Sequence, residues 1–287
     1  MGKVKIEKVA VIGAGVMGQG IAAHLANAGI PSVLLDIVPR DLKDEEKENP
    51  QARSRIAIGA IESLKKAKPA LLLVDRFAEL IQPGNIEDDL NLLYDCDWVV
   101  EAVIENLDIK RNLFQKILPF RKFGAVVTSN TSGISIARMV EGFPEDFRRN
   151  FFVTHFFNPV RYMKLLEIVV GKETDSEVVD SLVDFGRNVL GKGIVYGKDT
   201  PNFVANRIGV YGLMKAIQVM VEDGLTVEEI DAIAGPPMGR PKSAAFKTCD
   251  LVGLDTFAHV AKNVYDNLPD DDERSVFIMP GFIVKMI

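Results

Sequence analysis

The chain has 287 residues, of which 47% are apolar and 26% are charged, a length and balance that suit one large or two smaller globular domains. A formal net charge of −6 argues against nucleic acid as a partner, and the two cysteines, Cys96 and Cys249, are too few for a disulfide framework or a structural zinc site. Because no apolar stretch approaches the roughly 20 residues that span a bilayer, and the N-terminus lacks the apolar segment of a signal peptide, we expect a cytoplasmic protein outside the membrane.

Short apolar, β-branched runs alternate with helical patterns through the first two thirds of the chain. Between the first two runs, Met17, Ile21 and Leu25 fall on one face of a helix. Strand–helix alternation of this kind predicts an α/β fold, with a Rossmann-type, doubly wound and mainly parallel sheet. The runs expected to be strands are residues 9–12, 33–36, 98–103, 125–129, 151–155, 165–170 and 194–196.

Residues 40–70 interrupt this alternation. A polar run containing Pro50 is followed by an amphipathic helical pattern that ends in Lys65, Lys66 and Lys68. The segment is too long for a simple connection, so it predicts a helical excursion from the sheet.

The pattern changes again near Asp199. Thr200 is placed to cap a helix with Pro201 at its first position, and residues 203–221 hold only two charged side chains. A helix that is apolar nearly all round must be buried in a core or a subunit interface. Thr226 and Glu229 then have the spacing of a capping box.

These helical patterns predict two domains. The first covers residues 1–199 and the second, all-helical, covers residues 200–287. Residues 282–287 resemble the start of a helix that lacks a C-cap. We therefore expect the sequence to be a fragment with a truncated second domain.

A glycine-rich turn follows the first expected strand. Gly13, Gly15 and Gly18 have the GxGxxG spacing that allows a tight turn, close approach of a pyrophosphate and helix–strand packing. Asp36 ends the second strand, where a carboxylate can bind both ribose hydroxyls and repel a 2′-phosphate. NAD is favoured over NADP, with Arg40 as a weaker signal in the opposite direction. A glycine-rich turn without a ligand is the alternative interpretation.

One histidine of three stands at a strand end. His155 closes the run FFVTH, where α/β sheets bind ligands, whereas His24 and His259 have the settings of structural or surface residues. Glu167 lies inside the apolar run LLEIVV, where a carboxylate needs a partner. A His–Glu pair would explain both residues, because the carboxylate would orient the imidazole as a general base. A packed, non-catalytic histidine remains the alternative.

The motifs as a set resemble one family. The segments GAGVMGQGIA, VVEAVIENLDIK, SNTSGISI, HFFNPVRYMKLLEIV, DTPNFVANRIG and VGLDT occur in the order and spacing of the 3-hydroxyacyl-CoA dehydrogenases. This resemblance implies NAD-dependent oxidation of (S)-3-hydroxyacyl-CoA to 3-oxoacyl-CoA in fatty acid β-oxidation. It also implies that His155 is the general base and Glu167 its partner.

The resemblance implies roles for further residues, each of which also has an ordinary structural interpretation. Ser132 and Asn206 match the residues that hold the substrate hydroxyl or carbonyl, although both could be turn or cap residues. Ser63 and Lys68 fall on the helical excursion, which helps to bind CoA in the family, although a lysine-rich segment is more often a solvated surface. Four residues match positions near the nicotinamide half of NAD: Glu105, Lys110, Asn130 and Asn158.

Two departures from the family pattern concern the second domain. The segment GRPKSA, at residues 239–244, resembles larger members that are fused to an enoyl-CoA hydratase or isomerase domain, and the KTGxGFY-like segment of the family does not follow. A covalent fusion is therefore expected, and the family pattern also implies a homodimer through the helical domain. Two alternatives remain: a dehydrogenase of a non-CoA hydroxy acid, and a non-catalytic NAD-binding protein.

Overall fold

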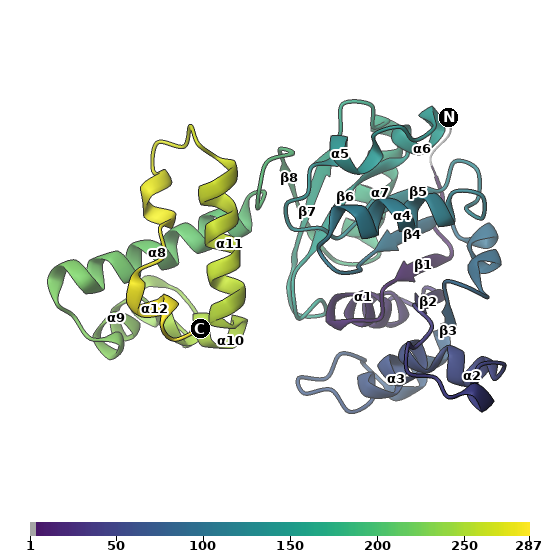
Figure 1. Cartoon of the computed structure of the whole chain (residues 1–287), viewed down its shortest axis with the longest axis horizontal. Helices are drawn as coiled ribbons and strands as arrows, with labels where there is room; N and C mark the ends of the chain where they lie inside the picture. Colours follow the sequence, from purple (N-terminus) through teal and green to yellow (C-terminus); the bar gives the residue numbers. More distant parts are fainter. Residues whose placement is uncertain (1–3) are drawn as a thin grey trace. The chain divides into compact units, whose positions relative to one another are not determined.

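The computed structural model describes residues 4–287, which divide into two compact units at the boundary between Asp199 and Thr200. Figure 1 shows the sheet-containing first unit in purple to teal and the helical second unit in green to yellow. The family fold expected from the sequence, a Rossmann-type sheet followed by helices, is confirmed.

The first unit is built on one eight-stranded sheet. Its order is β3-β2-β1-β4-β5-β6-β7-β8, and β1 to β6 run parallel in the arrangement of dinucleotide-binding folds. β7 runs antiparallel to β6, and β8 is parallel to β7. The strands are β1 Val9–Ile12, β2 Ser32–Asp36, β3 Ile81–Asn85, β4 Trp98–Glu101, β5 Val126–Ser129, β6 Phe151–Phe156, β7 Leu165–Val170 and β8 Gly193–Gly197.

Helices cover both faces of this sheet. One face packs against α1, α3 and α7 in a core that includes Phe152. The neighbouring Phe151 points to the opposite face, as strand alternation requires, where its ring contacts Phe114 of α4. The helices of the first unit are α1 Val16–Asn27, α2 Pro50–Arg53, α3 Arg55–Leu64, α4 Leu107–Ile117, α5 Ile136–Val140, α6 Glu145–Arg149 and α7 Ser176–Asn188.

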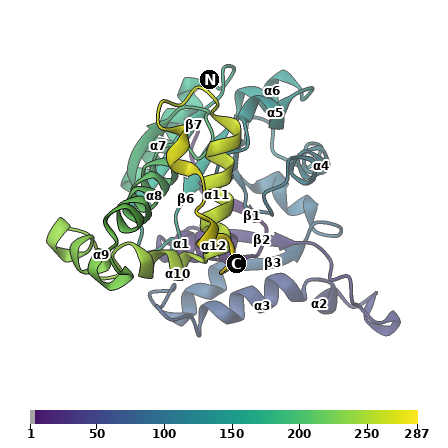
Figure 2. The ribbon, with the colours of Figure 1, turned by 60° about the vertical axis from the view of Figure 1, so that its left-hand side comes forward.

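The segment between β2 and β3 forms a helical arm, defined here as residues 40–74. It contains α2 and α3, and Figure 2 shows both helices beside β3 at the edge of the sheet. α3 ends at Leu64, so Lys65, Lys66 and Lys68 lie in the turn after the helix instead of on it. The arm is anchored by its apolar side, because Ala57, Ile61 and Leu64 are buried.

The sequence patterns did not predict β3, whose residues read IQPGN. Pro83 has no N–H to donate, and proline is normally excluded from central strands. β3 pairs only with β2, so it is an edge strand and tolerates this proline.

The second unit consists of helices around its own cores. They are α8 Ala205–Asp223, α9 Val227–Ile233, α10 Phe246–Val252, α11 Leu254–Asn267 and α12 Gly281–Val284. The predicted capping box is confirmed: Thr226 Oγ1 accepts from Glu229 N at 3.2 Å, and Glu229 Oε2 accepts from Thr226 N at 2.8 Å. Each bond satisfies a helix-end N–H group that would otherwise lack a partner.

The expected start of α8 was wrong, and the core of this chain buries only part of its apolar surface. The helix begins at Ala205 and not at Pro201, because Asn202 and Phe203 have φ angles of 62° and 44°, which no right-handed helix accommodates. It is also not buried all round: Val210, Met214 and Ile217 face the core, whereas Ile208 is 67% exposed. Leu213 and Met220 pack partly buried against the cores, whereas Val221 is exposed like Ile208 within this chain.

Candidate active site

The turn between β1 and α1 has the geometry of a pyrophosphate-binding loop. Gly13 has a φ of 105°, and a Cβ there would lie 2.5 Å from the carbonyl oxygen of Ala102. A Cβ on Gly18 would lie 1.7 Å from the carbonyl oxygen of Gly13, so the helix packs directly on the turn. Space is open around Gly15, where nothing lies within 4 Å of a Cβ position. The first turn of α1 therefore presents its N–H groups to an open surface.

Asp36 joins this loop from the end of β2. Its Oδ2 accepts a hydrogen bond from Ala14 N at 2.5 Å, and its Oδ1 accepts from Ile37 N at 2.7 Å. The carboxylate is half-buried. These two bonds orient the Asp36 carboxylate beside the glycine turn. There it can still accept hydrogen bonds from ribose hydroxyls, and its charge would repel a 2′-phosphate.

His155 and Glu167 lie opposite each other on adjacent strands. The antiparallel register of β6 and β7 pairs them, and His155 Nδ1 is 2.7 Å from Glu167 Oε2. Both side chains are buried, at 5% and 0% exposed. Carboxylate oxygens accept hydrogen bonds, so this contact holds the Nδ1 side of the ring toward Glu167. The pair thus fixes the orientation of the imidazole, and Nε2 lies on the side of the ring that faces away from Glu167.

The side chain of Ser132 lies beside Nε2 of His155. Its Oγ lies 3.3 Å from His155 Nε2. Its backbone N donates to Glu105 Oε1 at 2.9 Å, and the same carboxylate oxygen accepts from Thr131 Oγ1 at 2.5 Å. Glu105 therefore fixes the loop after β5 so that the Ser132 hydroxyl faces the histidine.

A buried ion pair lies under this loop. Lys110 Nζ is 2.7 Å from Glu101 Oε1, and the two side chains are 1% and 0% exposed. Glu101 also accepts bonds from Ser129 Oγ at 2.5 Å and from Val103 N at 2.7 Å. Burial raises the pKa of the Glu101 carboxyl, an effect that Lys110 and these two donors oppose. Lys110 Nζ also lies 3.3 Å from Glu105, so one cation joins both carboxylates.

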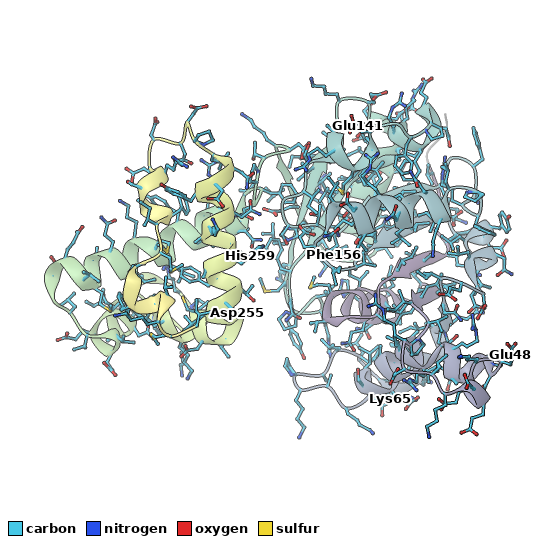
Figure 3. All side chains as sticks on the ribbon, in the orientation of Figure 1. Glu48, Lys65, Glu141, Phe156, Asp255 and His259 are labelled. Atoms are coloured by element: carbon cyan, nitrogen blue, oxygen red, sulfur yellow. The ribbon has the colours of Figure 1, made fainter. Side chains whose placement is uncertain are left out.

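The other residues expected at the site occupy different positions. Asn130 Oδ1 accepts from Phe156 N at 2.9 Å and so ties the ends of β5 and β6 together. Asn158 is exposed in the loop after β6, before Pro159. Asn206 lies on α8 in the second unit, so the first unit does not by itself bring it to the group around His155. His259 is exposed on α11, also in the second unit (Figure 3).

The two residues matched to CoA binding lie on different parts of the arm, one on α3 and one after it. Ser63 is exposed near the end of α3, and its Oγ donates to Gln19 Oε1 of α1 at 2.7 Å. Lys68 is exposed in the following turn. Lys65, marked on the arm in Figure 3, pairs with Glu62 at 2.8 Å. The arm thus presents lysines at its surface and contacts α1 through Ser63.

Sequence reasoning missed Glu101 and Lys192. Glu101 ends the buried strand WVVE, so the argument that singled out Glu167, a carboxylate costly to bury, applies to it as well. Lys192 is 5% exposed and its pKa falls to about 8 because of burial. No local pattern marks that lysine, which lies between two glycines.

Two kinds of feature are absent from residues 4–287. No group of three or more histidine, cysteine, aspartate or glutamate side chains in this part of the chain could hold a metal ion. None of its helices has the length and apolar character needed to cross a membrane.

Comparison with known families gives matches along nearly the whole chain. Residues 8–200 match the model of the 3-hydroxyacyl-CoA dehydrogenase NAD binding domain. Residues 203–283 match the model of the 3-hydroxyacyl-CoA dehydrogenase C-terminal domain.

Individual relatives agree with these matches. A probable 3-hydroxyacyl-CoA dehydrogenase of Bacillus subtilis (strain 168) is 54% identical over 98% of this chain, which spans 36% of that protein. A putative fatty acid oxidation complex trifunctional enzyme of Rickettsia felis is 38% identical over 99% of this chain, which again covers 38% of the relative. The crystal structure of (S)-3-hydroxybutyryl-CoA dehydrogenase PaaH1 from Ralstonia eutropha is 27% identical, with a TM-score of 0.78 over 98% of this chain and 93% of that one.

Proposed function

Because the chain belongs to the 3-hydroxyacyl-CoA dehydrogenase family, we propose that it oxidises the 3-hydroxyl of (S)-3-hydroxyacyl-CoA thioesters to a ketone, with NAD as the hydride acceptor. The observation that carries this proposal is the His155–Glu167 pair, with Ser132 Oγ 3.3 Å from the second histidine nitrogen. The proposed setting is fatty acid β-oxidation, in line with the name of the trifunctional relative.

The glycine turn fits the NAD that the family domain binds. Gly15 leaves room for a pyrophosphate, the N-terminus of α1 supplies N–H groups, and Asp36 suits the ribose hydroxyls of NAD better than a 2′-phosphate. Bound there, NAD supplies the acceptor for the hydride that leaves C3 of the substrate. On the family pattern, Glu105, Lys110, Asn130 and Asn158 are proposed to line the nicotinamide side.

The residues of the chain handle the proton and hold the substrate. His155 Nε2 takes the proton of the 3-hydroxyl, while Glu167 keeps the imidazole oriented and offsets the positive charge that it gains. Ser132 Oγ donates to the substrate oxygen, and Asn206 is proposed to add a second polar contact from α8. Ser63 and Lys68 are proposed to bind the nucleotide portion of CoA on the arm.

The test is direct turnover. The chain is mixed with NAD and (S)-3-hydroxybutyryl-CoA, and NADH formation is followed by absorbance. We expect His155→Ala to lose about 10²–10⁴-fold in kcat, the usual contribution of a general base, with NAD affinity unchanged. The exposed His259 provides the matched control, and His259→Ala should keep wild-type turnover.

Three outcomes would contradict the proposal at different points. Normal turnover by His155→Ala would show that another group takes the proton. Equal rates with free 3-hydroxybutyrate would show that CoA is not recognised. NAD binding without turnover of thioesters of any chain length would favour a non-catalytic NAD-binding protein.

Partners and location are proposed on narrower grounds. The trifunctional relative, of which this chain covers 38%, supports covalent fusion within a longer protein. An enoyl-CoA hydratase or isomerase domain is proposed as the fused part because the segment GRPKSA resembles the fused members of the family. The outward apolar side chains of α8, such as Ile208 and Val221, support a homodimer through the helical unit, which light scattering would test. A cytoplasmic location agrees with the two free, buried cysteines, whose burial raises each thiol pKa to about 11.

A further inference from the structure

The loop between β6 and β7, residues 157–164, forms a turn that is held by its own backbone hydrogen bonds and by the side chain of Lys192. The carbonyl oxygen of Pro159 accepts from Tyr162 N and Met163 N, both at 3.0 Å. Lys192 Nζ donates to the carbonyl oxygens of Val160 at 2.5 Å and Met163 at 2.8 Å. Hydrogen bonds from a charged donor are about twice as strong as neutral ones, so this buried ammonium makes the turn a rigid unit.

The same turn reaches the arm. Arg161 Nη1 donates to the carbonyl oxygens of Ala70 at 2.7 Å and Leu72 at 2.9 Å, and Tyr162 Oη donates to Ala70 at 2.9 Å. These acceptors lie in the segment that follows the lysines of the arm. The other side-chain bonds to this segment, within the described part of the chain, come from Asn27 of α1.

On its other side the turn touches the proposed base and the proposed cofactor helix. The ring of Phe157 lies 4.4 Å from that of His155, centroid to centroid. Val160 packs on α1, because a Cβ placed on Gly20 would lie 3.0 Å from Val160 Cγ2. One rigid turn therefore contacts the arm, α1 and the histidine.

We propose that Arg161 is a positioning residue, which couples occupation of the arm by the nucleotide portion of CoA to the placement of His155. The proposal rests on the proposed function, since it takes a CoA thioester as substrate. Arg161 holds two backbone carbonyls of the arm at once, so ordering of the arm by a bound nucleotide is passed to residues 157–164 and, through Phe157, to the imidazole. Binding energy from the remote part of the substrate then appears as catalytic rate.

Two substrates separate coupling from simple binding: (S)-3-hydroxybutyryl-CoA and the N-acetylcysteamine thioester of the same acid, which lacks the nucleotide. Wild type should show a higher kcat with the CoA ester. In Arg161→Gln that kcat should fall about tenfold, the equivalent of one hydrogen bond to a charged group, while KM for the CoA ester and kcat for the short ester change less than about twofold. Arg161→Lys, which keeps the charge and one donor nitrogen on a different side chain, should recover part of the loss.

Arg76→Gln is the matched control, because Arg76 follows the arm and contacts the ring of Phe77 instead of the turn. Arg76→Gln should leave kcat unchanged for both thioesters. A second readout needs no turnover: free CoA should slow hydrogen exchange at the amides of Tyr162 and Met163 in wild type but not in Arg161→Gln.

The outcomes discriminate between explanations. An equal loss of kcat with both thioesters would mean that Arg161 only supports the turn, and a rise in KM for the CoA ester alone would mean that it only supports the arm. Either result overturns the coupling. If wild type turned over neither thioester, the proposed function would fail, and the exchange experiment with free CoA would still decide whether the arm and the turn are coupled.

Discussion

The buried pair of Lys110 and Glu101 permits a prediction whose size follows from the structure. Lys110→Met removes the ammonium but keeps most of the apolar stem. Glu101, 0% exposed, then retains only the hydrogen bonds from Ser129 Oγ and Val103 N. Removing one partner of a buried ion pair costs about 3–5 kcal/mol, because the other charge is left uncompensated. We expect a loss of this size in the free energy of unfolding at pH 7.

The same variant should respond to pH in a defined direction. Burial already raises the pKa of Glu101, and losing Lys110 raises it further. Between the unfolded and the folded pKa, the folded state binds the additional proton, so acidification favours the folded variant. The stability deficit of Lys110→Met relative to wild type should therefore shrink as the pH falls from 7 toward 5.

Urea unfolding followed by tryptophan fluorescence measures this effect. Trp98 is the only tryptophan and is buried in β4, so it reports on the first unit. Glu101→Gln added to Lys110→Met should restore about 2 kcal/mol or more, since it removes the unpaired charge. The control is Lys47→Met, which breaks an exposed pair with Asp44 and should cost less than about 1 kcal/mol.

Two results would refute the reasoning. Lys110→Met could prove as stable as wild type at pH 7, which would mean that the ion pair contributes nothing beyond packing. Alternatively, its deficit could stay constant between pH 7 and 5, which would mean that Glu101 is already uncharged in the folded protein.

Three further predictions concern other parts of the chain. Gly18→Ala places a Cβ 1.7 Å from the carbonyl oxygen of Gly13, so NAD affinity by calorimetry should fall at least about tenfold, and unchanged affinity would disprove the close packing. The pKa of His24 is lowered to about 4 by burial and by the charge of Lys192, so its contribution of up to about 3 kcal/mol is present above pH 6.5 and lost as the pH falls to 4. His24→Gln should lack that acid-dependent loss in urea unfolding, and parallel pH curves for the two proteins would exclude His24 as its source. Thr226→Ala removes the cap of α9 and should cost the second unit about 1 kcal/mol in thermal unfolding followed by circular dichroism; an unaltered melting curve would show that the cap is dispensable.

Much of the candidate site is predictable from the amino-acid sequence, because its signals are local. The glycine spacing after β1, the carboxylate ending β2 and a charged residue inside an apolar strand are each visible within a few residues. The short connection between His155 and Glu167 also made their pairing foreseeable, since two strands joined by a short loop lie side by side. The same reasoning, applied to Glu101, would have found the second buried carboxylate.

Other features depend on residues that are distant in the sequence. Pro83 is compatible with a strand only because β3 lies at the sheet edge. Asn202, whose left-handed backbone precedes the start of α8 at Ala205, donates to the carbonyl oxygen of Val260, 58 residues away. The sequence alone determined the Rossmann-type fold and the chemical groups available for an NAD-dependent reaction. Only the tertiary structure decided which carbonyls Arg161 binds, 91 and 89 residues away. Such contacts follow from packing between whole elements, which local periodicity and the chemistry of single residues do not encode.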